Sequence, residues 1–265
     1  NPRGMQSAIV ATVFACISFF FVALRTYTRA VIVRNMGGED FIIIAAWICC
    51  LAMCILICLE AKFGNGRHIE TVSPENLRNT LFALYISVPV YQFGLVLVKI
   101  SILWQYYRIF PGKNIRMACN ILLVISVLYG FYCTLNNIFL CTPIKSYWTL
   151  SIAGKCLSRP AVWYSNAAIN IATDIAIFVL PMPALYHLHL PMKQKLALMA
   201  IFALGAFVVL VSILRLPELH MLVASHDPLY DGAAIAYWSN VELCVGVICA
   251  SLPTLRAFAA RYFPK

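Results

Sequence analysis

The stretch NIATDIAIFVLPMP, residues 170–183, is almost wholly apolar and yet carries one carboxylate, Asp174. Across the chain 62% of the residues are hydrophobic and 11% are charged, whereas a soluble domain has about half apolar and about a quarter charged residues. The chain is therefore predicted to lie in a membrane. Asp174 is then a charge placed in hydrocarbon.

Apolar runs long enough to cross a bilayer, which takes about 20 helical residues, recur along the chain. Polar joints with Pro or Gly separate them, for example residues 66–78, 110–116 and 189–195. We predict an all-α membrane protein, a single seven-transmembrane-helix bundle covering residues 1–265, with spans at about 8–33, 41–61, 79–108, 117–142, 161–186, 196–219 and 232–258.

The distribution of Lys and Arg predicts the orientation of the bundle. Residues 25–40, 105–117, 187–195 and the C-terminus hold eleven of them, and the other side holds eight. Because cytoplasmic loops carry the excess of Lys and Arg, we expect the N-terminus outside and the C-terminus in the cytosol. The net charge of +10 then suits anionic lipid headgroups, so membrane lipid is an expected partner and nucleic acid is not. The expected location is the plasma membrane or an endomembrane.

Most of the eleven cysteines fall inside the predicted spans, where free thiols are ordinary packing residues. Cys141 and Cys156 instead bracket the long fourth loop on the predicted outer side, where an oxidising compartment permits a disulfide. Cys58, at the outer end of the second span, is the competing partner. The sequence leaves the connectivity open.

Once the charges assigned to the loops and span ends are set aside, four charged side chains remain inside the predicted spans: Lys99, Asp174, Arg215 and Glu242. Each costs at least about 2.5 kcal/mol near the bilayer centre, so each should face the interior and find a partner. By helical rise, Lys99 and Asp174 lie about 13 and 18 Å from the cytosolic ends of their spans, and Glu242 and Arg215 about 21 and 28 Å from theirs. We expect the pairs Lys99–Asp174 and Arg215–Glu242, although the error in the span boundaries allows the partners to be exchanged.

Polar side chains recur at helical spacing beside these charges, every seven residues in the third span and every four in the fifth. The seventh span also has a polar face, around Glu242. Three polar helix faces that meet inside a bundle predict a polar cavity. Such side chains also join membrane helices where no ligand binds, and that role remains the alternative for the Asn and Tyr residues. The predicted cavity residues are Tyr85, Gln92, Lys99, Asn166, Asn170, Asp174, Arg215, Trp238 and Glu242.

A series of short motifs runs through the seven spans in a fixed order. It comprises Arg25-x-Tyr27-x-Arg29, Gly37-Gly38-Glu39-Asp40, Gly64-x-Gly66-x-His68, Lys99-x-Ser101, Tyr107-Arg108-Ile109-Phe110, Cys141-x-Pro143 with Trp148 and Cys156, Asn170 to Asp174 ahead of Pro181-x-Pro183, Gly205 through Arg215, Glu242 and Ala250-Ser251-x-Pro253-x-Leu255-Arg256. In this order the chain resembles the fungal rhodopsin-domain integral membrane proteins, a family that includes Pth-type receptor-like proteins. Other members are encoded beside secondary-metabolite genes. We identify no CFEM domain in residues 1–265, and Glu39 stands where the family usually has Asp.

The resemblance implies a receptor-like heptahelical protein whose buried polar cavity binds a small lipophilic ligand and whose cytosolic loops meet a signalling partner. The alternative is a membrane-embedded biosynthetic enzyme, an acid–base cyclase or isomerase acting on an isoprenoid or polyketide. Asp174 or Glu242 would then be the catalytic acid. Closed ion pairs at both Asp174 and Glu242 would favour a structural or switching role, whereas one of these two acids left unpaired and facing a cavity would favour the enzyme. The sequence leaves enzymatic activity open.

No cofactor or metal is predicted. Retinal proteins of the microbial type form a Schiff base with a lysine in the last helix, and residues 232–258 contain none. Lys99, the sole lysine in a predicted span, is expected to be ion-paired. His187-x-His189 lacks the further ligands that a metal site needs.

Overall fold

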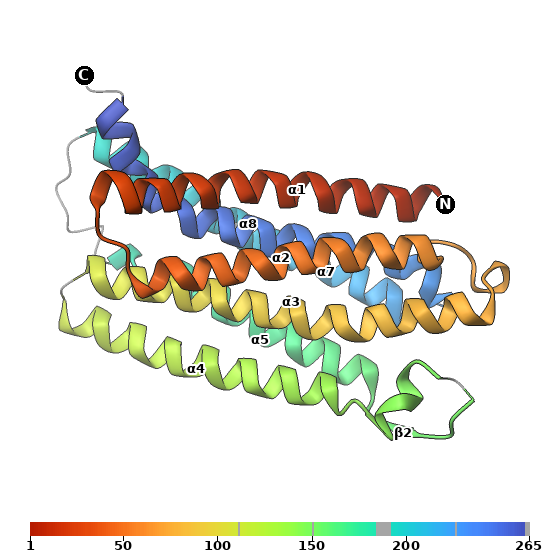
Figure 1. The fold of residues 1–265 in the computed structure, drawn as a ribbon. Coiled ribbons are helices and arrows are strands. Elements are labelled where there is room, and N and C mark those ends of the chain that lie inside the picture. Colours follow the sequence, from red (N-terminus) through yellow and green to blue (C-terminus); the bar gives the residue numbers. More distant parts are fainter. Residues whose placement is uncertain (111, 150, 184–191, 226, 263–265) are drawn as a thin grey trace.

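The computed structural model describes residues 1–110, 112–149, 151–183, 192–225 and 227–262. Within these residues seven helices are long and apolar enough to cross a membrane, which confirms the predicted fold class. The helices run side by side along one axis, and the two termini lie at opposite ends of the bundle (Figure 1). We call these the N-terminal end and the C-terminal end of the bundle.

The elements follow one another with short connections. They are α1 (Pro2–Tyr27), the π-helix η1 (Thr28–Val33), α2 (Gly38–Phe63), the 3-10 helix η2 (Ile69–Thr71), α3 (Pro74–Ile109), α4 (Lys113–Ile138), β1 (Cys141–Thr142), the 3-10 helix η3 (Ile144–Tyr147), β2 (Lys155–Cys156), α5 (Arg159–Val179), α7 (Met192–Ala224) and α8 (Pro228–Tyr262). The two short strands pair antiparallel, with Cys141 opposite Cys156.

Several helix boundaries differ from the predicted spans. The third helix begins at Pro74 rather than residue 79, because Pro suits the first turn and the Ser73 side chain accepts a hydrogen bond from the N–H of Asn76. The described part of α5 ends at Val179, and residues 184–191, including His187 and His189, lie outside the described residues. Helix α8 runs past both ends of the predicted span 232–258.

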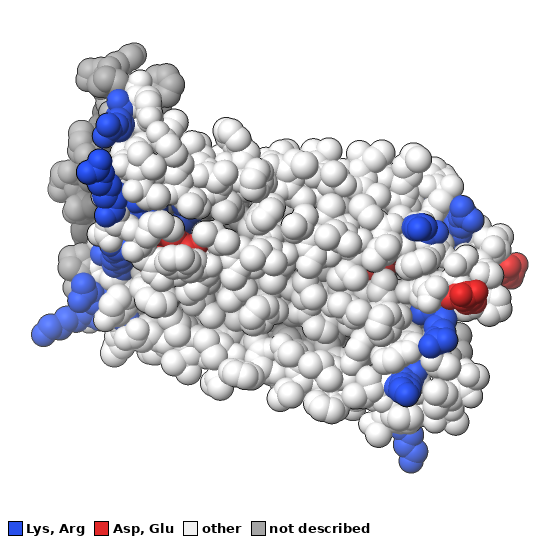
Figure 2. All heavy atoms as spheres, viewed as in Figure 1, with Lys and Arg blue, Asp and Glu red and all other residues white. Residues whose placement is uncertain are grey.

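The surface of the bundle is divided along its axis. On the face shown in Figure 2, Lys and Arg gather at both ends, exposed acids lie at the N-terminal end, and most of the middle carries no charge. Large apolar side chains are exposed there, for example Leu128 and Phe131 of α4. Such a band is what hydrocarbon requires of a spanning bundle.

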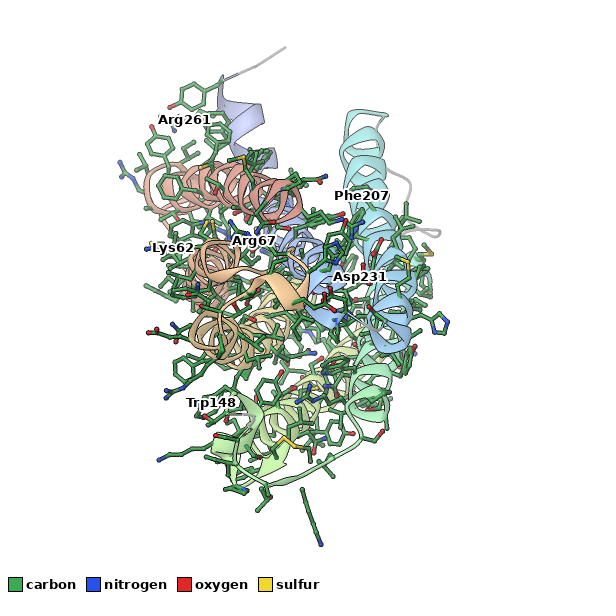
Figure 3. The ribbon with its side chains drawn as sticks, turned by 90° about the vertical axis from the view of Figure 1, so that its right-hand side faces the viewer. Lys62, Arg67, Trp148, Phe207, Asp231 and Arg261 are labelled. Carbon is green, nitrogen blue, oxygen red and sulfur yellow. A yellow bond between two sulfur atoms is a disulfide. The ribbon has the colours of Figure 1, made fainter. Side chains whose placement is uncertain are left out.

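Among the described residues, α8 is the most enclosed of the seven helices, with 67% of its most apolar 18-residue stretch buried. It packs against α1, α2, α3 and α7, and the view onto the N-terminal end places it between α1 and α7 (Figure 3). Small side chains such as Ala11, Ala15 and Ala46 let the neighbouring helices approach in the core that α8 shares with them.

Ion pairs join several helices at the C-terminal end of the bundle. Arg25 of α1 is fully buried and pairs with Asp40 of α2 at 2.7 Å, while Arg108 of α3 pairs with Glu39 at 2.6 Å. Arg25 also donates to the carbonyl of Ala250 in α8. Glu39 and Asp40 of the Gly-Gly-Glu-Asp motif, together with Arg25, therefore join four helices, a role beyond favourable charge at a helix N-terminus.

Candidate functional site

Lys99 and Asp174 form a buried ion pair across α3 and α5. The Lys99 Nζ lies 3.1 Å from Asp174 Oδ1, and it also donates to Asn170 Oδ1 at 2.7 Å and to the hydroxyl of Thr173. The exposed fractions of the two side chains are 3% and 10%. The pairing is the one predicted, and it gives the Asp174 carboxylate the cation that a charge in hydrocarbon requires.

Arg215 and Glu242 form the second predicted pair, across α7 and α8. Arg215 Nε lies 3.4 Å from Glu242 Oε2, and the Tyr91 hydroxyl stands between them, accepting from Arg215 Nη1 and donating to Glu242 Oε2. Glu242 Oε1 accepts from Asn170 Nδ2 at 2.8 Å and from the hydroxyl of Ser212. Tyr91 and Ser212 are not among the predicted cavity residues. Ser212 lies three residues before Arg215 on one helix face, whereas Tyr91 falls off the seven-residue polar stripe of α3.

Asn170 joins the two ion pairs into one network. Its side-chain oxygen accepts from Lys99, and its amide nitrogen donates to Glu242 Oε1 and, at 3.2 Å, to Asp174 Oδ2. We call the connected group the charge layer; it links α3, α5, α7 and α8 and consists of Tyr91, Lys99, Asn170, Asp174, Ser212, Arg215 and Glu242.

A cavity of about 280 Å³ lies between the charge layer and the N-terminal end of the bundle. Its walls are mostly apolar, with Leu84 and Val88 from α3 and Trp163 from α5 among them. Arg215 and Tyr91 line it on the side of the charge layer. We call this space the main cavity.

A smaller cavity of about 80 Å³ lies on the opposite side of the charge layer. Lys99, Asp174 and Glu242 line it, together with Gln105 and Tyr106. The sequence predicts one polar cavity, whereas in the described part of the chain the charge layer lies between these two cavities.

The predicted cavity residues are thus divided among several places. Gln92, Asn166 and Arg215 line the main cavity, and Lys99, Asp174 and Glu242 line the smaller one. Asn170 lies in the charge layer.

Like Asn170, two further predicted cavity residues are not among those that line the two cavities. Tyr85 packs against Tyr147 and Trp148 and donates to the carbonyl of Ile138 at 3.0 Å. Trp238 packs against a valine cluster between α7 and α8. Both aromatic side chains therefore have packing roles outside the two cavities.

The loop between α4 and α5 forms part of the cavity wall. A disulfide joins Cys141 to Cys156, and Cys58 is a free, exposed thiol. Inside the loop Tyr147 is buried and lines the main cavity, and the Arg159 guanidinium lies over its ring at 4.9 Å. Burial raises the pKa of Tyr147 to about 12, so its hydroxyl keeps its proton at neutral pH.

At the N-terminal end a polar contact ties the loop after α2 to the start of α8. His68 Nδ1 lies 3.0 Å from Asp227 Oδ2, which also accepts from the N–H of Ile69 at 3.2 Å. Desolvation acts to raise the pKa of Asp227, but the hydrogen bonds from His68, Ile69 and Tyr230 lower it below the ordinary 3.8. The His68 ring stacks on Tyr230. Figure 3 shows the bundle from this end, where Arg67 and Asp231 are labelled.

Comparison with known proteins points to one family. The fungal rhodopsin domain matches residues 24–261. A SAT4 family membrane protein of Emericella nidulans is 32% identical over 216 residues, which cover 79% of this chain and 54% of that protein. The chain therefore spans about half the length of this relative. No solved structure matches the chain.

Two further relatives bear names that point to different roles. A polyenoic acids biosynthesis gene cluster protein of Metarhizium anisopliae is 26% identical over 96% of this chain and 73% of its own length. The receptor GIN3 of Arthrobotrys oligospora is 24% identical over 100% of this chain and 65% of its own length. With the family match over most of the chain and seven apolar helices long enough to span a bilayer, this integral multi-pass membrane protein belongs to the fungal rhodopsin domain family.

Proposed function

We propose that the protein is a receptor-like heptahelical membrane protein that binds a small lipophilic ligand in the main cavity. The observation that carries the proposal is the cavity itself, about 280 Å³ with mostly apolar walls and a polar end formed by the charge layer. A concave apolar site with a few convergent polar groups is typical of small-molecule binding. The names of the relatives, a receptor and proteins of biosynthetic gene clusters, agree with a small molecule as ligand.

The charge layer offers a route from the ligand to the rest of the bundle. Arg215 and Tyr91 line the main cavity and both contact Glu242, which reaches Lys99 through Asn170. A ligand that changes the contacts of Arg215 therefore changes the forces between four helices. If it binds two arrangements of these helices unequally, it shifts their populations.

Two neighbouring alanines of α5 provide a matched test of ligand binding. Ala167 is buried and lines the main cavity, whereas Ala168 is exposed on the outside of the bundle. We expect Ala167→Phe to fill part of the cavity and Ala168→Phe to leave it open. The protein is purified from its native membrane, and organic extracts are compared by mass spectrometry. A lipophilic compound retained by wild type and Ala168→Phe but lost from Ala167→Phe supports the proposal; equal retention by all three contradicts it.

The enzyme alternative is weakened by the closed ion pairs. A carboxylic acid that donates a proton must carry one at the working pH, whereas Asp174 and Glu242 each lie against a cation. Cells that carry Asp174→Asn or Glu242→Gln at normal protein level are compared with cells that lack the gene. A lipophilic product lost in the point mutants would favour the enzyme, whereas an unchanged metabolite profile favours the receptor.

A further inference from the structure

Glu60 is a buried acid of the main cavity that belongs to neither predicted ion pair. It lies near the end of α2, its exposed fraction is 0%, and it lines the main cavity. Its Oε2 accepts from Asn65 Nδ2 at 3.0 Å. Among the described residues, its Oε1 is buried without a hydrogen-bond partner and no ion pair includes Glu60.

The turn after α2 fixes this carboxylate in place. Gly64 and Gly66 adopt φ of 126° and 85°, a region that favours glycine, and the turn carries the Asn65 side chain back to Glu60. The turn is itself held at both sides, since Asn1 Nδ2 donates to the carbonyl of Asn65 at 2.7 Å and the N–H of Gly66 donates to the carbonyl of Leu229 at 2.9 Å. The Gly64-x-Gly66 motif therefore positions Asn65, which in turn orients the Glu60 carboxylate.

The nearby side chains do not complete the hydrogen bonding of Glu60. Ser87 lies within hydrogen-bonding reach of the carboxylate, but the same hydroxyl donates to the carbonyl of Leu84 at 3.0 Å, so its one hydrogen is shared between two acceptors. Arg159 also lines the cavity, but it lies over the Tyr147 ring. A buried carboxylate oxygen without a donor is costly, and the space beside it is the main cavity.

We propose that Glu60 is a ligand-binding residue and that the ligand of the main cavity is an amphiphile with an O–H or N–H donor. The donor group binds Glu60 Oε1, and the hydrocarbon body lies along the apolar wall toward Arg215. This inference rests on the proposed function and specifies the chemical class of its ligand.

Isomeric probes test the donor requirement. Decanol and methyl nonyl ether have the same atoms, but only the alcohol can donate a hydrogen bond; decylamine adds a cationic donor and decane has no polar group. Binding to the full chain in lipid nanodiscs is measured as the rise in unfolding temperature with probe concentration. Partitioning into lipid cancels when one probe is compared between two variants in the same lipid.

We expect the alcohol and the amine to stabilise wild type at lower concentration than the ether. Glu60→Gln should weaken the donor probes about tenfold, because a neutral amide oxygen accepts a weaker hydrogen bond than a carboxylate does. Glu70 is an exposed acid at the same end, and Glu70→Gln should change nothing. A larger loss for the amine identifies an ammonium group as the preferred donor, and equal losses show that a hydroxyl and an ammonium group serve equally. Equal binding of alcohol and ether by wild type, which needs no variant, overturns the inference, as does unchanged binding by Glu60→Gln.

The same probes separate this inference from the proposed function. If all four probes stabilise wild type equally and Ala167→Phe removes the effect, the cavity binds lipophilic molecules and only the role of Glu60 fails. If no probe stabilises wild type, both proposals fail.

Discussion

At the scale of single residues, the main finding is that each of the four predicted intramembrane charges has a partner. The pairs could be predicted because an ion in hydrocarbon needs an opposite charge and helical rise limits which ions meet. Uncharged polar residues carry no such constraint, so the bridging role of Asn170 and the position of Tyr91 could not be predicted. Glu60 was missed because it lies at the edge of its predicted span, 41–61, where an acid ordinarily reaches water.

Replacing one member of a buried ion pair by an apolar residue should lower the free energy of unfolding far more than replacing both members. We expect Lys99→Met to lower the free energy of unfolding by about 3 kcal/mol, because Asp174 is left buried without its cation. The double variant Lys99→Met/Asp174→Leu should recover most of this loss. Denaturant unfolding in detergent measures both; additive losses would show that the two residues do not act as a pair.

Asp227 gives the contact at the N-terminal end a defined pH dependence. Its pKa is lowered in the folded protein, so the stability that it contributes is complete above its ordinary value of 3.8 and is lost as pH falls through the lower folded value. Asp227→Asn should therefore lower the unfolding temperature at pH 7, and its difference from wild type should shrink as pH falls below 3.8. A difference that is constant over this range would contradict the assignment.

At the scale of elements, hydropathy predicts which segments are helices but not where they end. A run of apolar residues identifies α3 without difficulty, whereas its start depends on Ser73 and Pro74, whose capping roles lie outside the apolar pattern. The loop between α4 and α5 shows the same limit. Its two cysteines mark a possible disulfide, but nothing in the sequence shows that Tyr147 folds back into a cavity wall.

The disulfide should stabilise this wall. The cysteines are 15 residues apart, and closing a loop of this size stabilises a protein by about 3 kcal/mol. Cys141→Ser/Cys156→Ser should lose about this amount and bind the decanol probe more weakly, because Tyr147 is no longer held. Cys58→Ser, the matched free and exposed thiol, should unfold like wild type. Equal behaviour of the two variants would contradict the role assigned to the loop.

At the scale of the whole molecule, the seven-helix bundle follows from composition, but its orientation remains a prediction. The excess of Lys and Arg predicts the N-terminus outside, and a disulfide at the N-terminal end of the bundle agrees with an oxidising compartment on that side. A glycosylation acceptor sequence inserted after Ala153 should then be modified, and one inserted after Met36 should not. The opposite pattern of gel shifts would reverse the orientation.

The central claim is that the main cavity, rather than the lipid-facing surface, binds a small lipophilic molecule. Photoaffinity labelling with an alkyl diazirine, mapped by peptide mass spectrometry, tests this most directly. We predict saturable labelling of the cavity wall at Leu84 and Trp163, which an excess of decanol suppresses. Labelling confined to lipid-facing positions such as Leu128 and Phe131, rising with probe concentration without saturation, would contradict the claim.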